Sequence, residues 1–378
     1  MGISYLGPVN GHDIERLIKV FHVAKRINGA VIIHVVTHKG HGYKPAERNP
    51  AKFHGIGPFD IATGKELKAS DKPTYSDVFS EKICQLAKKD KSIVAVTAAM
   101  PDGTGLNKFS KWFPDRFFDV GIAEEHAVTF SAGMAAGGLK PVFAVYSSFL
   151  QRAYDQITQD VCINGNAVTF AVFAGSVYGM NDVTHLGLQD IPMLNSIPGL
   201  IYLAPVTKED YIAMLDWSLT QNEYPVAIKV PGGSMISTGV PVTKDFGKLD
   251  TYEITKKGSR VAILGLGTFY ETAVKAANIL KTSHGIDATV INPYYISGID
   301  ADTLNELKKD HAVVATLEDG YLEGGFGAKI AAYYGSSDMK VLNFGIKKEF
   351  IDRYDASEVL KDNHLTPEQI AEDIAATL

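Results

Sequence analysis

The sequence predicts an α/β protein with mainly parallel sheets, helices on both faces, and a smaller C-terminal α/β domain. Three observations lead to this prediction. From Tyr75 onward, short apolar runs alternate with amphipathic segments of helical period. These segments are long enough to be crossovers between parallel strands, which are almost always right-handed. The chain has 378 residues, 46% of them hydrophobic, enough for two or three domains with cores of their own.

The first part of the chain is a short structured segment followed by a polar one. An amphipathic helix is predicted over residues 13–27 and a largely apolar strand over residues 30–37. The glycine-rich stretch KGHGYKP follows, and then a polar region that contains three prolines, Pro50, Pro58 and Pro73. We therefore predict that residues 1–55 belong to an N-terminal domain and that residues 56–73 are a linker.

The main domain is predicted over residues 74–236 and the C-terminal domain over residues 252–378. In the main domain, helices are expected over residues 75–89, 149–163 and 208–219, and strands over residues 93–97, 142–146, 168–173, 201–204 and 226–230. In the C-terminal domain, strands are expected over residues 261–264, 288–291 and 312–317, and helices over residues 271–281 and 300–309. Strands separated by helices in this way are typical of parallel sheets, whose ligands bind at the carboxyl ends of the strands.

Composition excludes several classes of protein. The net charge is −6 and no basic block stands out, so nucleic acid is not an expected partner. No apolar stretch approaches 18 residues and no signal peptide opens the chain, which predicts a cytoplasmic protein without a membrane span. Cys84 and Cys162 both lie in amphipathic helical patterns and are expected to be buried thiols, neither a disulfide nor a metal site.

The stretch FFDVGIAEEHAVTFSAGMAAGG, residues 117–138, organises the rest of the chain. A short apolar run ends at a glycine, and a helix rich in alanine begins near Ala123. Glu124 and Glu125 are adjacent in its first turn, and neighbouring side chains on a helix point about 100° apart. We expect one to be buried and the other exposed. Glutamates in a first turn often only interact favourably with the helix dipole. A helix this rich in small residues should, however, be packed closely by its neighbours, and that packing would place the buried carboxyl group in a low dielectric.

One glycine pattern in the C-terminal domain resembles a dinucleotide-binding motif. Gly265, Leu266 and Gly267 follow a predicted strand, but Tyr270 stands where the third glycine is needed. A dinucleotide site is therefore not predicted here.

Four stretches of the sequence resemble the thiamine-diphosphate-dependent transketolase-like enzymes. They are DVGIAEEHAVTFSAGMA in the central motif, YSSFLQRAYDQITQDV at residues 146–161, YLGPVNGHDIERL at residues 5–17, and THKGHGYKPAERNPAKFHG at residues 37–55. The residues of these stretches are most similar to the branch of the family that makes 1-deoxy-D-xylulose 5-phosphate. The resemblance implies a transketolase-like fold, with residues 1–55 as a remnant of the diphosphate-binding domain, residues 74–236 as the pyrimidine-binding domain, and residues 252–378 as the transketolase-type C-terminal domain.

The resemblance also assigns roles to six residues. Glu124 matches the glutamate that bonds to the cofactor's pyrimidine ring and that must hold a proton at neutral pH, which burial would favour. Phe149 matches the aromatic ring that stacks on the pyrimidine, with Tyr146 and Arg152 on either side of it in the sequence. His185 matches a histidine at the substrate mouth, and His54 one at the reactive end of the cofactor. Glu125 is expected to be structural.

The implied reaction is the decarboxylation of pyruvate and the transfer of the two-carbon unit to D-glyceraldehyde 3-phosphate. Thiamine diphosphate and Mg²⁺ are the implied cofactors. The metal would be held by a Gly-Asp-Gly stretch followed by Asn, which this sequence lacks, so no metal ligand is predicted in the chain. The expected partners are the N-terminal half, either a separate chain or a part clipped off, and a second copy in a homodimer. Isoprenoid and thiamine biosynthesis both remain open as the pathway.

Two departures from the family pattern leave the acceptor open. Phe173 and Gly232 stand where the resemblance places arginines that bind the acceptor's phosphate, and only Lys229 keeps a positive charge nearby. One alternative is therefore the C-terminal subunit of a split transketolase-like enzyme with another donor or an unphosphorylated aldehyde acceptor. The other alternative is a scaffold without catalysis, which the retention of Glu124, Phe149 and His185 argues against.

Overall fold

The computed structural model describes residues 2–67, 73–232 and 235–378, which form two compact units divided between Asp71 and Lys72. Residues 68–72 of the predicted linker and 233–234 of the predicted main domain lie outside the described residues. No helix in the described ranges is long and apolar enough to cross a membrane.

The first unit is small and open. Two parallel strands, β1 (Ser4–Asn10) and β2 (Val31–Val36), are joined by helix α1 (Ile14–Ala24), which begins at an Asp13 cap. The predicted helix and strand are confirmed, and β1 was not predicted. Helix α2 (Lys44–Arg48), a 3₁₀ turn (Lys52–His54) and a hairpin of β3 (Phe59–Asp60) and β4 (Lys65–Glu66) follow. The hairpin lies within the stretch that was predicted to be a linker.

The second unit begins with a six-stranded parallel sheet in the order β6-β5-β7-β8-β10-β9. Its strands are β5 (Ile93–Thr97), β6 (Phe117–Asp119), β7 (Lys140–Tyr146), β8 (Thr169–Phe173), β9 (Ile201–Leu203) and β10 (Val226–Val230). Every residue of β5, β8 and β10 is buried, as expected for parallel strands covered on both faces. The predicted parallel sheet is confirmed.

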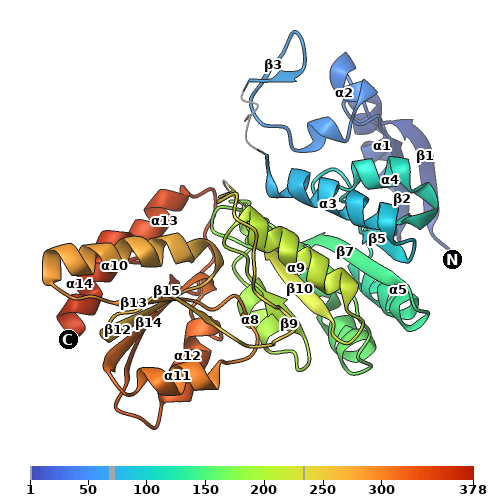
Figure 1. Cartoon of the computed structure of the whole chain (residues 1–378). Coiled ribbons are helices and arrows are strands. Elements are labelled where there is room, and N and C mark those ends of the chain that lie inside the picture. Colours follow the sequence, from blue (N-terminus) through green and yellow to red (C-terminus); the bar gives the residue numbers. More distant parts are fainter. Residues whose placement is uncertain (1, 68–72, 233–234) are drawn as a thin grey trace. The chain divides into compact units, whose positions relative to one another are not determined.

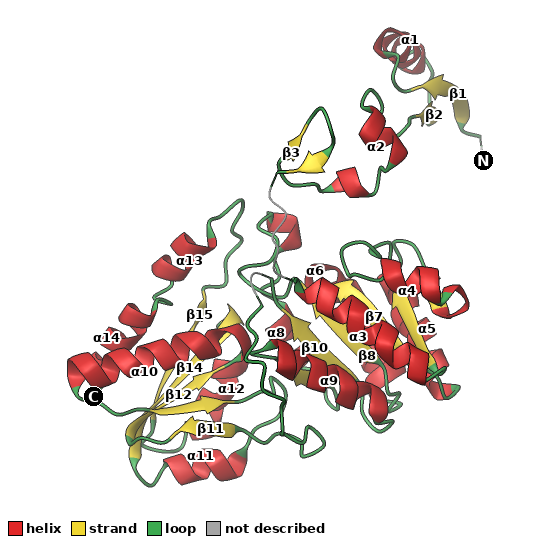
Figure 2. Ribbon diagram, turned by 45° about the horizontal axis from the view of Figure 1, so that its top comes forward, coloured by secondary structure: helices red, strands yellow, loops and turns green. Residues whose placement is uncertain are grey.

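Helices cover both faces of this sheet because alternate residues of each strand point to opposite sides (Figure 1). Val94 and Val96 face helix α5 (Glu124–Ala136), whereas Ile93 and Ala95 face α3 (Tyr75–Lys89). Helices α3 and α9 (Lys208–Thr220) lie side by side on that second face (Figure 2). Both start at capping boxes, Thr74 with Asp77 and Thr207 with Asp210. The shorter helices α4 (Asn107–Trp112) and α8 (Asp190–Asn195) were not predicted.

The segment after β7 corrects the prediction of one α-helix over residues 149–163. It consists of α6 (Ser147–Leu150), a 3₁₀ turn (Gln151–Ala153), α7 (Tyr154–Gln156) and a π-helical stretch (Ile157–Cys162). The amide of Ile163 bonds to the carbonyl of Thr158, five residues earlier, at 3.0 Å. Such wide turns frequently occur near functional sites, and apolar periodicity alone does not reveal them.

The C-terminal part of the second unit holds a five-stranded sheet in the order β11-β13-β12-β14-β15, parallel except for β11. Its strands are β11 (Glu253–Lys256), β12 (Arg260–Gly265), β13 (Thr289–Asn292), β14 (His311–Tyr321) and β15 (Lys340–Ile346). Its helices are α10 (Tyr270–His284), α11 (Ala301–Leu307), α12 (Phe326–Tyr334), α13 (Ala356–Asp362) and α14 (Pro367–Thr377). Helices α10 and α14 cover one face and α11 and α12 the other (Figure 1).

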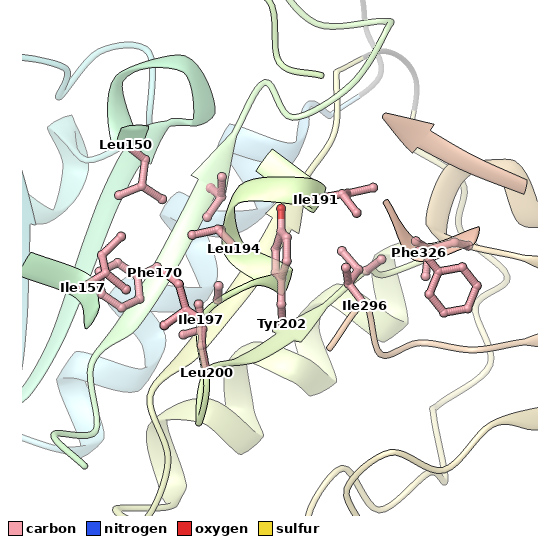
Figure 3. Close-up of a cluster of buried hydrophobic side chains, with 14 of the residues drawn as sticks. Leu150, Ile157, Phe170, Ile191, Leu194, Ile197, Leu200, Tyr202, Ile296 and Phe326 are labelled. Carbon is pink, nitrogen blue, oxygen red and sulfur yellow. The ribbon is translucent and has the colours of Figure 1, made fainter. Parts of the chain in front are cut away.

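One apolar cluster joins the two sheets of this unit (Figure 3). Phe170 of the first sheet and Phe326 of α12 both belong to it, and Tyr202 and Ile296 lie between them. An antiparallel bridge also connects Leu203 with Tyr295. The two α/β parts therefore share a core, so loops of the first sheet are supported by residues of the second.

Candidate active site

Three loops at the carboxyl ends of the first sheet bring the predicted site residues of the second unit together. Glu124 follows β6, Phe149 follows β7, and His185 lies in the loop after β8. Ligands of parallel sheets bind at this edge because the connecting loops meet there. The structure therefore groups five of the six predicted residues at the expected edge of the sheet.

Glu124 is the first residue of α5 and only 2% exposed, whereas Glu125 is exposed. The prediction that one of the two would be buried is confirmed. The loop before the helix is fixed by Asp119, whose Oδ1 accepts hydrogen bonds from the amides of Ala99, at 2.8 Å, and Gly121, at 3.0 Å. Gly121 has φ of 74°, a conformation that glycine adopts at little cost. Asp119 was not predicted as a site residue, although its position between an apolar run and a glycine was a usable signal.

Arg152 is the hydrogen-bond partner of the buried carboxylate. Its Nη1 donates to Oε1 of Glu124 at 3.2 Å and to Oε2 at 3.1 Å. The guanidinium also lies 5.5 Å from the centre of the Phe149 ring. These two hydrogen bonds hold the Glu124 carboxyl group in a fixed position at the start of α5. A carboxylate has about four lone-pair positions, so Arg152 leaves acceptor capacity free.

Phe149 stands at the centre of an aromatic group. Its ring lies 6.0 Å from that of Tyr146 and 5.2 Å, edge to face, from that of His185. Tyr146 packs over Gly103, where any side chain would overlap its hydroxyl group. Burial, and then the nearby carboxylate of Asp102, raise the pKa of the Tyr146 hydroxyl, so it remains a hydrogen-bond donor at neutral pH.

His185 is half-buried at the end of a loop that the C-terminal part of the unit holds in place. The amide of Val183 donates to Oδ1 of Asp352 at 3.0 Å, and Nδ2 of Asn181 donates to the carbonyl of Tyr354 at 3.1 Å. The hydroxyl of Tyr354 donates to the carbonyl of Val177 at 2.9 Å. These contacts join residues about 170 positions apart, so no local sequence pattern indicates them.

His54 lies in the first unit and is exposed there, within hydrogen-bond distance of Lys39 at 2.9 Å. Its place at the reactive end of the cofactor stays a prediction.

Lys229 does not provide a free positive charge near Gly232. It is 4% exposed, and its Nζ donates to Oδ2 of Asp190 at 2.6 Å. The Tyr202 hydroxyl donates to the same oxygen. Asp190 and Tyr202 were not singled out from the sequence, and nothing in their local pattern distinguishes them from ordinary core positions.

The glycine pair of the C-terminal domain has a packing role. Gly267 has φ of 54°, and a side chain there would come within 3.2 Å of Ala204 in the other half of the unit. The adjoining cavity measures only about 10 Å³. Gly267 therefore allows the two halves of the unit to approach each other, whereas Gly265 allows α10 to pack closely on β12. The space beside Gly267 is far too small for a dinucleotide.

The arrangement fits an aromatic ring with a basic nitrogen. Glu124 offers a buried carboxyl group, Phe149 a half-buried ring, and Tyr146 and His185 polar groups on either side. The pyrimidine of the predicted cofactor has these properties. Within the ranges that the structure describes, no three His, Cys, Asp or Glu side chains gather as a metal site.

Three family models match the chain. The pyrimidine-binding domain of transketolases matches residues 71–235, and the transketolase C-terminal domain matches residues 250–370. The N-terminal model of 1-deoxy-D-xylulose-5-phosphate synthases matches residues 1–37. Together the three models cover most of the chain in the expected order.

Curated proteins similar to this chain are named 1-deoxy-D-xylulose-5-phosphate synthase. The protein of Clostridium acetobutylicum is 47% identical over 354 residues, 93% of this chain and 56% of the relative. The protein of Lachnoclostridium phytofermentans is 42% identical over 380 residues, 99% of this chain and 60% of the relative. The chain therefore spans well under two thirds of the length of these relatives.

Solved structures with a similar fold are transketolases. A split-gene transketolase, described as an inactive beta4 tetramer, matches with a TM-score of 0.69 and 24% identity, over 80% of this chain and 97% of its own. Transketolase from Pichia stipitis in complex with sedoheptulose 7-phosphate matches with a TM-score of 0.66 and 16% identity, over 82% of this chain and 46% of its own. At these identities the likeness concerns the fold alone.

Proposed function

Because this chain belongs to the transketolase-like family, and resembles its 1-deoxy-D-xylulose-5-phosphate synthases over nearly its whole length, we propose that it is the pyrimidine-binding part of a thiamine-diphosphate-dependent transferase. The proposed reaction is the decarboxylation of pyruvate and the transfer of the remaining two-carbon unit to an aldehyde. The name of the relatives corresponds to glyceraldehyde 3-phosphate as that aldehyde. One observation carries the proposal: a carboxyl group only 2% exposed lies at the same sheet edge as Phe149 and His185.

Thiamine diphosphate, when bound, supplies a thiazolium carbon that can carry the electron pair of the two-carbon unit. The residues of this chain bind and orient. Glu124 holds a proton in a hydrogen bond to the ring nitrogen of the pyrimidine, and Phe149 offers that ring an apolar face. His185 donates a hydrogen bond to the substrate oxygen. Burial of Glu124 keeps water away from this hydrogen bond and so strengthens it.

The proposal also includes parts of the enzyme outside the second unit. Mg²⁺ and the diphosphate group would be held by the N-terminal half of the diphosphate-binding domain, as a separate chain or as part of a longer one. His54 would approach the reactive end of the cofactor. A homodimer and a cytoplasmic location are part of the same proposal.

The decisive experiment replaces Glu124 by Ala and measures pyruvate-dependent release of CO₂. The assay contains this chain, the polypeptide that completes the N-terminal domain, thiamine diphosphate and Mg²⁺. We expect at least about a 100-fold loss, the usual effect of removing a group that takes part in proton transfer. Glu125→Ala is the matched control, because Glu125 is the exposed neighbour on the same helical turn, and it should stay within about twofold of the wild type. Full activity of Glu124→Ala would instead support a scaffold without catalysis.

A further inference from the structure

A cleft of about 260 Å³ opens beside the candidate active site, at the carboxyl ends of β7, β8 and β10. We name it the tyrosine cleft after three of its lining residues, Tyr75, Tyr146 and Tyr178. Phe173, Met180 and Gly232 form other parts of its wall. Tyr146 belongs to the cleft and also contacts Phe149, so the cleft adjoins the site where the two-carbon unit is proposed to be held.

The lining of the tyrosine cleft is uncharged. Among its described residues are three tyrosines, a serine, a threonine and a methionine, but no lysine, arginine or histidine. Two cations of the described residues that lie near the ends of β7 and β10 are engaged elsewhere. Lys229 is paired with buried Asp190, and Arg152 with Glu124. A phosphate group entering this cleft would find hydroxyl donors but no fixed positive charge.

Burial and nearby carboxylates raise the pKa values of the three tyrosine hydroxyl groups of the cleft. Burial, followed by the carboxylates of Asp210 and Asp319, raises the pKa of the Tyr75 hydroxyl to about 12. Burial and Asp319 likewise raise the pKa of Tyr178, and burial and Asp102 raise that of Tyr146. All three hydroxyl groups therefore stay protonated and uncharged at neutral pH.

Backbone geometry and packing restrict which side chains can line the cleft. At Gly232, a side chain of any kind would overlap the carbonyl oxygen of Tyr178. Phe173 is 4% exposed and packs edge to face on Phe79 at 5.4 Å. Ala174, next to it, has φ of 57°, which a non-glycine residue adopts only when its surroundings enforce it. A cation at position 232 would require a different local backbone, and one at position 173 would have to replace the packing of Phe173 on Phe79.

We propose that the tyrosine cleft receives the aldehyde acceptor, and that this acceptor is an uncharged, unphosphorylated hydroxyaldehyde. The inference rests on the proposed function and deepens it. Hydroxyl groups of the three tyrosines can both donate and accept hydrogen bonds, which suits the hydroxyl groups of a short sugar aldehyde. The hydroxyl groups of Thr74 and Ser76 already donate to Asp77 and to the carbonyl of Gly103. A doubly charged phosphate would lose its hydration there without gaining a cation in exchange.

The step is balanced without a further reactant. The bond between the carbonyl carbon of pyruvate and its carboxylate breaks and CO₂ leaves. The electron pair of that bond forms the new carbon–carbon bond to the carbonyl carbon of the aldehyde. The carbonyl oxygen of the aldehyde takes up one proton and becomes a hydroxyl group. With glyceraldehyde the product is an unphosphorylated five-carbon 1-deoxy ketose.

The experiment compares D-glyceraldehyde with D-glyceraldehyde 3-phosphate as acceptors for the complete enzyme: this chain, the polypeptide that completes its N-terminal domain, thiamine diphosphate, Mg²⁺ and pyruvate. Ketose formation and CO₂ release are both measured. We expect kcat/KM for D-glyceraldehyde to equal or exceed that for the phosphorylated aldehyde. A larger kcat/KM for the phosphorylated aldehyde would overturn the inference and leave the proposed function intact. Absence of any pyruvate-dependent CO₂ release would overturn the proposed function and the inference together.

A substitution in the cleft tests whether the acceptor binds there. Met180→Lys places a cation in the lining, and Met180→Gln is the uncharged control of similar size. We expect the lysine variant to shift the ratio of kcat/KM values at least about fivefold toward the phosphorylated aldehyde, and high salt to remove the shift. The same ratio in both variants would show that the acceptor does not enter this cleft.

Discussion

Nη1 of Arg152 donates to both carboxylate oxygens of Glu124, at 3.2 and 3.1 Å, and so joins the segment after β7 to the first residue of α5. The carboxylate is 2% exposed, and the guanidinium is about half exposed. Arg152 also covers one side of the Phe149 ring. One side chain thus fixes the positions of two residues from different loops, both of which are proposed to contact the cofactor.

Arg152→Met is expected to destabilise the protein. Breaking a buried ion pair costs about 3–5 kcal/mol when one charge is left behind, but water at the exposed side of Arg152 reduces this to about 1–3 kcal/mol. The free energy of unfolding, measured in urea at pH 8 for wild type and variant, provides the test. An Arg152→Met protein as stable as the wild type would mean that water replaces the guanidinium fully.

The coupling between the two side chains is isolated by a double-mutant cycle. Glu124→Gln combined with Arg152→Met removes both charges, so the double variant should be less destabilised than the sum of the two single variants. We expect an interaction free energy of about 1–2 kcal/mol. Additive losses would show that the two residues act on stability independently.

Glu318 predicts a pH dependence of stability. Burial raises the pKa of its carboxyl group to about 7, against the lowering effect of the Gly327 and Phe326 amides, each of which donates to it at 2.8 Å. In the unfolded chain the pKa returns to about 4.5. Between these two values the folded protein binds more protons than the unfolded one, so the free energy of unfolding falls as pH rises from 4.5 to 7. The total fall from this group should be about 2–3 kcal/mol.

Glu318→Gln removes that contribution. The amide oxygen can still accept from one of the two backbone amides, and no proton is bound or released between pH 4.5 and 7. The measurement is the urea midpoint of the second unit at several pH values in that window, for wild type and variant. Parallel pH profiles for both proteins would refute the assignment to Glu318.

The central strands of the first sheet were predictable because each of them is a continuous apolar run in the sequence. Strands β5, β8 and β10 are apolar throughout, and their burial on both faces requires that pattern. Several of the missed elements are short or partly polar: β1 contains Pro8, β11 is mostly exposed, and α8 has only six residues. The longer α12, α14 and β15 were also not predicted. The places of β1 and β11 are decided by their pairing with β2 and β13, and local sequence does not record that pairing.

Some features of the candidate site were likewise predictable from local sequence, and others were not. The burial of Glu124 beside exposed Glu125 followed from helical geometry, because adjacent side chains cannot share one face. The partner of that carboxylate did not follow, since Arg152 reaches it through an irregular segment of 3₁₀ and π turns. The hydrogen bond between the His185 loop and Asp352 was not predictable either, because Asp352 is distant in the sequence.

The two cysteines should react slowly in the folded protein. Cys84 is buried and Cys162 half-buried, so the expectation of two buried thiols is fully confirmed for Cys84 only. Burial raises the pKa of both thiols, to about 12 for Cys162, and the thiolate is the reactive form. With an aromatic disulfide reagent at pH 8, we expect both thiols to react within minutes in guanidinium chloride and at least about 100-fold more slowly without it. Rapid reaction of one thiol in the folded state would show that its helix opens readily.

Gly187 is expected to be essential for the position of His185. A side chain there would overlap the carbonyl oxygen of Ala174, so Gly187→Ala must move the backbone two residues from the histidine. We expect a loss of kcat of at least about tenfold, since displacements near 1 Å have effects of this order or larger. Gly133→Ala is the matched control: Gly133 lies in α5 with open space around its Cα, so alanine should raise the free energy of unfolding by about 0.5–1 kcal/mol. The measurements are steady-state CO₂ release and urea unfolding of both variants. Equal kcat for Gly187→Ala and wild type would mean that the loop tolerates the shift and that His185 has no strict positional role.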